Sequence, residues 1–191
     1  MTQEEAGSRV SAVWRWAAPA AVVLALLGCA TPARVDQMKV ETPAATRTAI
    51  TTSAMKEAVA IGQVGGGKDT NPLWVSNIST ADFEAALRSS LQSAGLLAPD
   101  PQKCRVQLTA QLLSLDQPAF GLDMTVTASV LYTLTDCATR KEVWVKTLTL
   151  PYTAKFGDAV LGVERLKLAN EGAARVNIAK LVELLGEFKP Q

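Results

Sequence analysis

The chain has 191 residues, long enough for one domain whose hydrophobic core stands without cross-links. Its 19 lysines and arginines nearly balance 18 acidic residues, which argues against a nucleic-acid-binding protein, because such proteins normally carry a basic excess. It contains no histidine, which excludes Ser-His-Asp and Cys-His catalytic centres, His-ligated zinc sites and imidazole pH switches.

The first 28 residues have the organisation of a signal peptide. A polar stretch precedes an apolar run of about 13 residues that begins at Trp16 and ends in Leu26-Leu27-Gly28-Cys29. A helix needs about 20 apolar residues to span a bilayer, so this run is too short for that, but it has the size of a signal-peptide core. A transmembrane helix, or a plain secretory signal with a chance cysteine, is the alternative.

The tetrapeptide at the end of this run resembles the lipobox of bacterial lipoprotein precursors. Leu26, Gly28 and Cys29 match the pattern, whereas Leu27 is bulkier than the residue usually found there. The resemblance implies that residues 1–28 are removed and that Cys29 carries diacylglycerol and an acyl chain such as palmitate. Two or more such chains give stable membrane attachment. Because Cys29 is followed by alanine rather than aspartate, the same analogy implies the outer membrane, with the protein facing the periplasm.

Residues 29–54 are predicted to be the lipidated cysteine and a flexible tether. Proline, threonine and alanine dominate this segment, and it has no sustained helical or strand period. The alternative is an extended segment along the edge of the domain, which Val35, Met38 and Val40 would support. Residues 55–187 are then a single α/β domain in the periplasm.

The folded part is predicted to begin with a strand and a helix. A short apolar run over residues 56–64 ends at three glycines, which predicts a strand. Ser79 and Asp82 have the spacing of a capping box, and apolar residues then recur every three or four positions. This pattern predicts a helix that ends at Gly95, where a left-handed C-cap is needed.

Three strands and a long helix follow. Apolar and polar residues alternate in three segments, which predicts antiparallel strands joined by hairpins. These segments are 104–115, 122–135 and 141–153. A last helix is predicted to start at Asp158 and to end at Gly186, with Gly172 weakening its middle by about 1 kcal/mol relative to alanine. The fold class is therefore α+β in the order β-α-β-β-β-α, a two-layer sandwich with two helices on one face of a mostly antiparallel four-stranded sheet.

Cys104 and Cys137 are predicted to form a disulfide. Folding the second and third strands into a hairpin about residues 119–120 brings these cysteines together, and an oxidising periplasm favours the bond. Paired residues on one face should sum to an even number here, and 104 and 137 do not, so a bulge or a place for Cys137 in the turn is required. Two free thiols are the alternative.

The sequence offers few groups for catalysis. Residues 62–69 come within one residue of a phosphate-binding P-loop, but Asp69 stands where serine or threonine should hold magnesium. Asn71-Pro72 also separates this loop from the helix that would bind the phosphate. We therefore expect a loop after an edge strand and no nucleotide. No two carboxylates have the placement of an acid–base pair, so no catalytic residue, metal ligand or cofactor is predicted.

Two groups of residues are candidates for a partner surface. Asn170 and Glu171 interrupt the apolar stripe of the last helix without an evident structural need. Thr125, Thr127 and Ser129 lie on the hydroxyl-rich face of a long predicted strand. For Asn170 and Glu171, the alternative is a helix surface with local hydrogen bonds.

The overall plan is similar to small α/β domains of Gram-negative envelope lipoproteins: those of lipopolysaccharide assembly, the peptidoglycan-synthase activators and the N-terminal part of curli secretion lipoproteins. The similarity covers the architecture of residues 55–187 without a specific motif, so no functional residue is carried over. It implies a non-enzymatic accessory role, with an envelope protein as partner and no nucleic acid. A lipid- or glycan-binding module is the alternative, and an unrecognised enzyme is the third reading.

Overall fold

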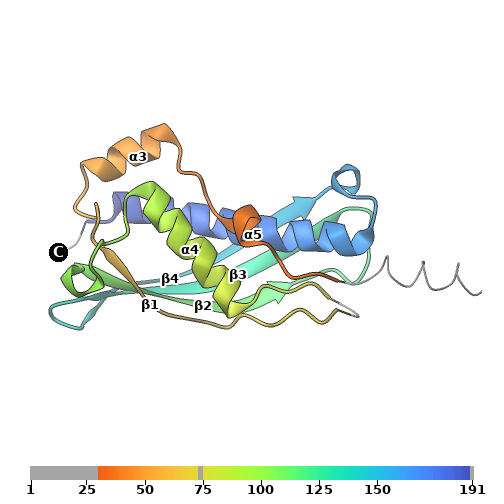
Figure 1. The fold of residues 1–191 in the computed structure, drawn as a ribbon, viewed down its shortest axis with the longest axis horizontal. Coiled ribbons are helices and arrows are strands. Elements are labelled where there is room, and N and C mark those ends of the chain that lie inside the picture. The colour runs from red at the N-terminus through yellow and green to blue at the C-terminus, as the bar shows by residue number, and fades with distance from the viewer. Residues whose placement is uncertain (1–29, 73–74, 190–191) are drawn as a thin grey trace, which may run out of the picture.

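The computed structural model describes residues 30–72 and 75–189, and one four-stranded sheet forms its centre (Figure 1). The strands lie in the order β1-β2-β3-β4. Their bounds are β1 Val59–Gly65, β2 Val106–Asp116, β3 Met124–Asp136 and β4 Glu142–Ala154. The helices are α2 Val35–Met38, α3 Ala44–Thr51, α4 Thr80–Ala94 and α5 Gly162–Glu187. The predicted signal peptide and Cys29 lie outside the described residues. Within those residues, no helix combines the length and the apolar character needed to cross a bilayer.

The sheet has the predicted pairing. Strands β2, β3 and β4 form antiparallel hairpins, with Val106 opposite Asp136 and Leu134 opposite Trp144. Strand β1 is parallel to β2, because α4 carries the chain back to the same end before β2 begins. The helices cover one face of the sheet, where the inward-pointing residues of the strands form the core (Figure 1). The predicted α+β fold is therefore confirmed.

Helix α4 begins and ends as its sequence predicts. The Ser79 hydroxyl accepts a hydrogen bond from the Asp82 amide at 3.0 Å, which satisfies one of the free donors of the first turn. Gly95 follows the helix with φ of 75°, the left-handed conformation that glycine adopts without steric cost. Phe83, Leu87 and Leu91 point into the core and are each at most 1% exposed.

Helix α5 has different ends from those predicted. It begins at Gly162, whereas Asp158 lies in a separate turn in which its carboxylate accepts a hydrogen bond from the Lys155 amide at 2.8 Å. At the other end the helix continues through Gly186 to Glu187. A Cβ at residue 186 would lie 3.1 Å from Ile50 of α3, so this glycine brings the two helices close together and does not end α5.

Gly172 has a packing role in α5 that could not be inferred from its low helix propensity. The ring of Tyr152 on β4 lies directly against the Gly172 backbone, where a Cβ would overlap the ring atoms. The guanidinium of Arg175, 5.5 Å from the ring centroid, covers the same tyrosine. This glycine therefore lets the sheet approach the middle of α5.

We expect Gly172→Ala to lower the free energy of unfolding by about 1–3 kcal/mol, because the ring of Tyr152 must move aside. On helix propensity alone, the same change would stabilise the protein by about 1 kcal/mol. Urea unfolding followed by circular dichroism distinguishes the two outcomes by sign. The matched control is Gly157→Ala, since a Cβ at residue 157 meets nothing within 4 Å.

Residues 30–54, which we call the N-terminal strap, pack on the domain, so the prediction of a flexible tether is wrong for the described part of this segment. Helix α2 contacts α4 and α5, and α3 contacts the same two helices. Met38 and Ile50 are at most 1% exposed, and the Val40 amide donates a hydrogen bond to the Ser90 hydroxyl. A few well-placed apolar residues are enough to hold a segment whose average composition resembles that of a linker. The edge-packing alternative, with Met38 and Val40, is the better description.

Candidate functional site

Asn170 and Glu171 do not lie on a partner surface, because both are at most 1% exposed. The Glu171 carboxylate accepts hydrogen bonds from the Arg34 backbone amide at 2.8 Å and from Nε and Nη2 of the same residue at 3.0 Å each. Asn170 donates to the Ser76 carbonyl at 2.8 Å and accepts from the Gln117 side chain at 2.9 Å. These two residues bind segments of their own chain, which removes them from the candidate surface.

A third buried polar residue of α5, Asn177, was missed by the sequence analysis. Its amide nitrogen donates to the carbonyls of Ala128 on β3 and Leu148 on β4, at 3.1 and 2.9 Å. Its oxygen accepts the Tyr132 hydroxyl proton at 2.9 Å, and burial raises the pKa of that phenol well above its ordinary value. The signal was the spacing, because Asn177 follows Asn170 by seven residues and therefore lies on the same helix face.

Thr125, Thr127 and Ser129 alternate along β3 with buried core residues, so they point to the opposite face of the sheet. Figure 1 shows the described helices on the core side of the sheet, away from this face. Their hydroxyls pair across strands: Thr125 with Thr153 at 2.8 Å, and Ser129 with Thr149 at 2.9 Å. Outward-pointing residues of β2, β3 and β4 are mostly hydroxyl, amide or aliphatic. Their charged members, Asp116 and Glu142, stand at strand ends. We call this surface the open sheet face.

The structure joins Cys104 and Cys137 in the predicted disulfide, with Cα atoms 6.1 Å apart. Cys104 lies two residues before the start of β2, and Cys137 directly follows the last residue of β3. Cys137 is the first residue of the turn that follows β3, and its amide donates to the Arg105 carbonyl at 3.0 Å. The position in the turn resolves the parity of the pairing, one of the two solutions that the sequence allowed.

The glycine-rich segment after β1 packs against the start of α4. The Gly67 amide donates to the Thr80 hydroxyl at 3.1 Å, and the Lys68 amide donates to the Ile78 carbonyl at 2.9 Å. A Cβ at residue 67 would overlap the backbone nitrogen of Thr80. Because Gly67 has no side chain, the loop backbone can lie directly against the first turn of α4.

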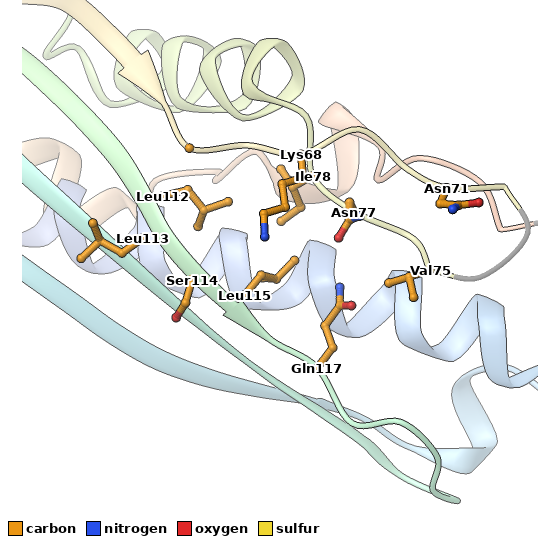
Figure 2. Close-up of a pocket in the computed structure, with 11 residues that line it drawn as sticks. Lys68, Asn71, Val75, Asn77, Ile78, Leu112, Leu113, Ser114, Leu115 and Gln117 are labelled. Atoms are coloured by element: carbon orange, nitrogen blue, oxygen red, sulfur yellow. The ribbon is translucent and has the colours of Figure 1, made fainter.

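A pocket of about 380 Å³ lies between the β1–α4 connection and the end of β2 (Figure 2). It opens there because β1 pairs with β2 only as far as Gln111, after which the chain leaves the sheet toward α4. The lining combines apolar side chains, among them Val75 and Leu115, with the amides of Asn77 and Gln117. This pocket could not be predicted from the sequence, because its two walls are about 40 residues apart in the chain.

Lys68 is the charged residue of the pocket lining, and its side chain points into the space between the loop and β2 (Figure 2). Within the part of the chain that the structure describes, its ammonium group forms neither a hydrogen bond nor an ion pair. The amides have partners, because Asn77 donates to the Asp69 carbonyl and Gln117 to the Ser76 carbonyl. Lys68 is therefore the group of the pocket that could attract an anionic ligand.

Among the described residues, no three acidic or cysteine side chains lie close enough to hold a metal ion. Neither a protein-family model nor a curated protein matches the sequence. The fold is similar to that of a Xanthomonas campestris protein of the family DUF330, with a TM-score of 0.52 and 11% identity over 68% of this chain and 85% of that one.

Two further solved structures are less similar and are described as bacterial lipoproteins. A proposed lipoprotein of Caulobacter crescentus has a TM-score of 0.47 and 12% identity, covering 75% of this chain and 95% of that one. A minor lipoprotein of Acinetobacter baumannii has a TM-score of 0.38 and 12% identity, covering 69% of this chain and 89% of that one. At such identities the likeness concerns the fold alone.

Proposed function

We propose that the protein is a non-enzymatic lipoprotein, anchored to the outer membrane through Cys29, that acts in the periplasm as an accessory or assembly factor for an envelope protein. The resemblance of residues 26–29 to a lipobox supports the anchor. The disulfide between Cys104 and Cys137 supports an oxidising compartment.

The open sheet face is the observation that carries the partner proposal. Burying a polar group is costly unless it is hydrogen-bonded, and here Thr125 pairs with Thr153 and Ser129 with Thr149. A partner can therefore cover these hydroxyls without leaving them unsatisfied. Half-exposed Val143 and Val145 on β4 add apolar surface at one end, which is typical of a protein-binding face.

Site-specific photo-crosslinking in intact envelopes tests this proposal. A photoreactive amino acid at Thr127 or Thr147, both on the open sheet face, is expected to capture one and the same envelope protein. The matched control is Gln92, an exposed residue of α4 on the opposite side of the domain. Adducts that form equally from Gln92, or that differ between Thr127 and Thr147, would contradict a partner on this face.

A second candidate function, binding of an anionic lipid or glycan, is favoured by the pocket at Lys68. Its volume of about 380 Å³ is within the range of small-molecule sites, and its lining offers one cation among apolar side chains and amides. Calorimetric titration with phosphorylated lipid and glycan fragments tests it. Saturable heat that is lost in Lys68→Gln would support this function over a purely protein-binding role.

A further inference from the structure

Exposed apolar side chains gather at one end of the domain. Of the eight large hydrophobic residues that are exposed within the described part of the chain, five lie in two loops. Phe120 and Leu122, which are 86% and 73% exposed, belong to the β2–β3 loop. Phe156, Val160 and Leu161, at 51%, 82% and 50%, belong to the β4–α5 loop. We call these five residues the apolar end, and such a cluster on a small domain marks an interaction site.

The two loops of the apolar end are tied to each other. The Asp123 carboxylate in the first loop accepts a hydrogen bond from the Lys155 ammonium in the second at 2.9 Å, and this bond lowers the pKa of Asp123. Arg165, in the first turn of α5, donates to the Val160 carbonyl at 2.8 Å and to the Gly121 carbonyl at 3.4 Å. The loops therefore present their side chains as one surface held in place by polar contacts.

The apolar end lies at the same end of the domain as the first described residues (Figure 1). Thr31 accepts a hydrogen bond from Lys167, in the second turn of α5, at 3.0 Å. The Ala30 amide donates to the Pro72 carbonyl at 2.8 Å. Because α5 starts directly after the β4–α5 loop, Ala30 and the apolar end share one side of the molecule. Ala30 directly follows Cys29 in the sequence, so an anchor on Cys29 would join the described chain at this side.

We propose that the apolar end enters the bilayer surface next to the lipid on Cys29, so that the domain stands on the membrane in one orientation. This inference rests on the proposed anchor, since acyl chains on Cys29 would bring these loops to the lipid surface. The charges of the two loops support it, because Asp123 and Lys155 form a pair and the Asp158 carboxylate binds a backbone amide. Within these two loops, the apolar side chains thus project beside one ion pair and one carboxylate, that of Asp158, which a backbone amide holds in place.

Fluorescence quenching by bromine-labelled lipids tests the proposal on the lipidated mature protein reconstituted in phosphatidylethanolamine–phosphatidylglycerol vesicles. Phe120→Trp and Val160→Trp place an indole in each loop at highly exposed positions, so folding is preserved. Val143→Trp is the matched control, because it lies beside the β3–β4 turn, about 40 Å away along strands of this length. All variants share the native tryptophans, whose signal in the unsubstituted protein is subtracted.

We expect bromines in the acyl chains to quench the fluorescence of the indoles at positions 120 and 160 about threefold or more strongly than that of the indole at position 143. Flotation of the same vesicles reports the anchor separately. Protein that floats while positions 120 and 160 are quenched no more than 143 would overturn this inference and leave the anchor standing. Protein that does not float would overturn both. Crosslinking of position 120 to a second copy, without quenching, would assign the apolar end to self-association and also overturn the inference.

Discussion

Replacing Arg34 with alanine is expected to lower the free energy of unfolding by about 3–5 kcal/mol, because it leaves the Glu171 carboxylate buried without its cationic partner. Glu171 is 1% exposed in its side chain, whereas that of Arg34 is 44% exposed. The reverse change, Glu171→Gln, leaves a guanidinium that can turn to water, so we expect a loss of only about 1–2 kcal/mol. Urea unfolding followed by circular dichroism measures both.

The matched control for this pair is Arg88→Ala on α4. Arg88 and Glu84 have the same 3.0 Å separation as Arg34 and Glu171, but their side chains are 48% and 39% exposed. Surface pairs of this kind contribute about 0.3–0.5 kcal/mol. Similar losses for Arg34→Ala and Arg88→Ala would show that burial of Glu171 does not matter and that the N-terminal strap is held by its apolar residues alone.

Removal of the disulfide is expected to cost about 4 kcal/mol. Cys104 and Cys137 are separated by 33 residues, and closing a loop of that length lowers the entropy of the unfolded chain by this amount on the chain-entropy model. The double variant Cys104→Ser, Cys137→Ser should unfold at correspondingly lower urea concentration. Reduced wild-type protein should match it.

Reductant provides the control for the disulfide, because it should leave the stability of the double serine variant unchanged. Mass spectrometry after alkylation gives an independent readout. If both thiols are alkylated in protein that was never reduced, the bond is absent from the protein in solution and no stability difference is expected.

The sheet and α4 could be predicted because their information is local. Alternation along β2, β3 and β4 and the caps Ser79 and Gly95 each depend on a few neighbouring residues. Shifting one of these strands by one residue would turn its apolar side chains from the core to solvent, so the alternation also restricts how neighbouring strands pair. The parity of Cys104 and Cys137 likewise required either a bulge or a place for Cys137 in the turn, and the structure has the second.

The strap and the polar residues of α5 could not be predicted in the same way, because their partners are distant in the chain. Arg34 and Glu171 are 137 residues apart, and Asn170 meets Ser76 across 94 residues. A polar residue on an apolar stripe has the same local pattern whether it is buried against its own chain or exposed to a partner. The lipobox lies outside the described residues and stays a prediction.

The packing of residues 30–54 also limits the distance between residue 30 and the sheet. Stretched out, a segment of this length would reach about 85 Å, enough to carry the domain well away from its attachment point. Because the segment is instead folded against α4 and α5, it adds almost nothing to the distance between residue 30 and the domain. Any pulling force applied at Cys29 would therefore act first on the hydrogen bonds of Ala30 and Thr31, and only then on the bonds of Arg34 and the packing of Met38.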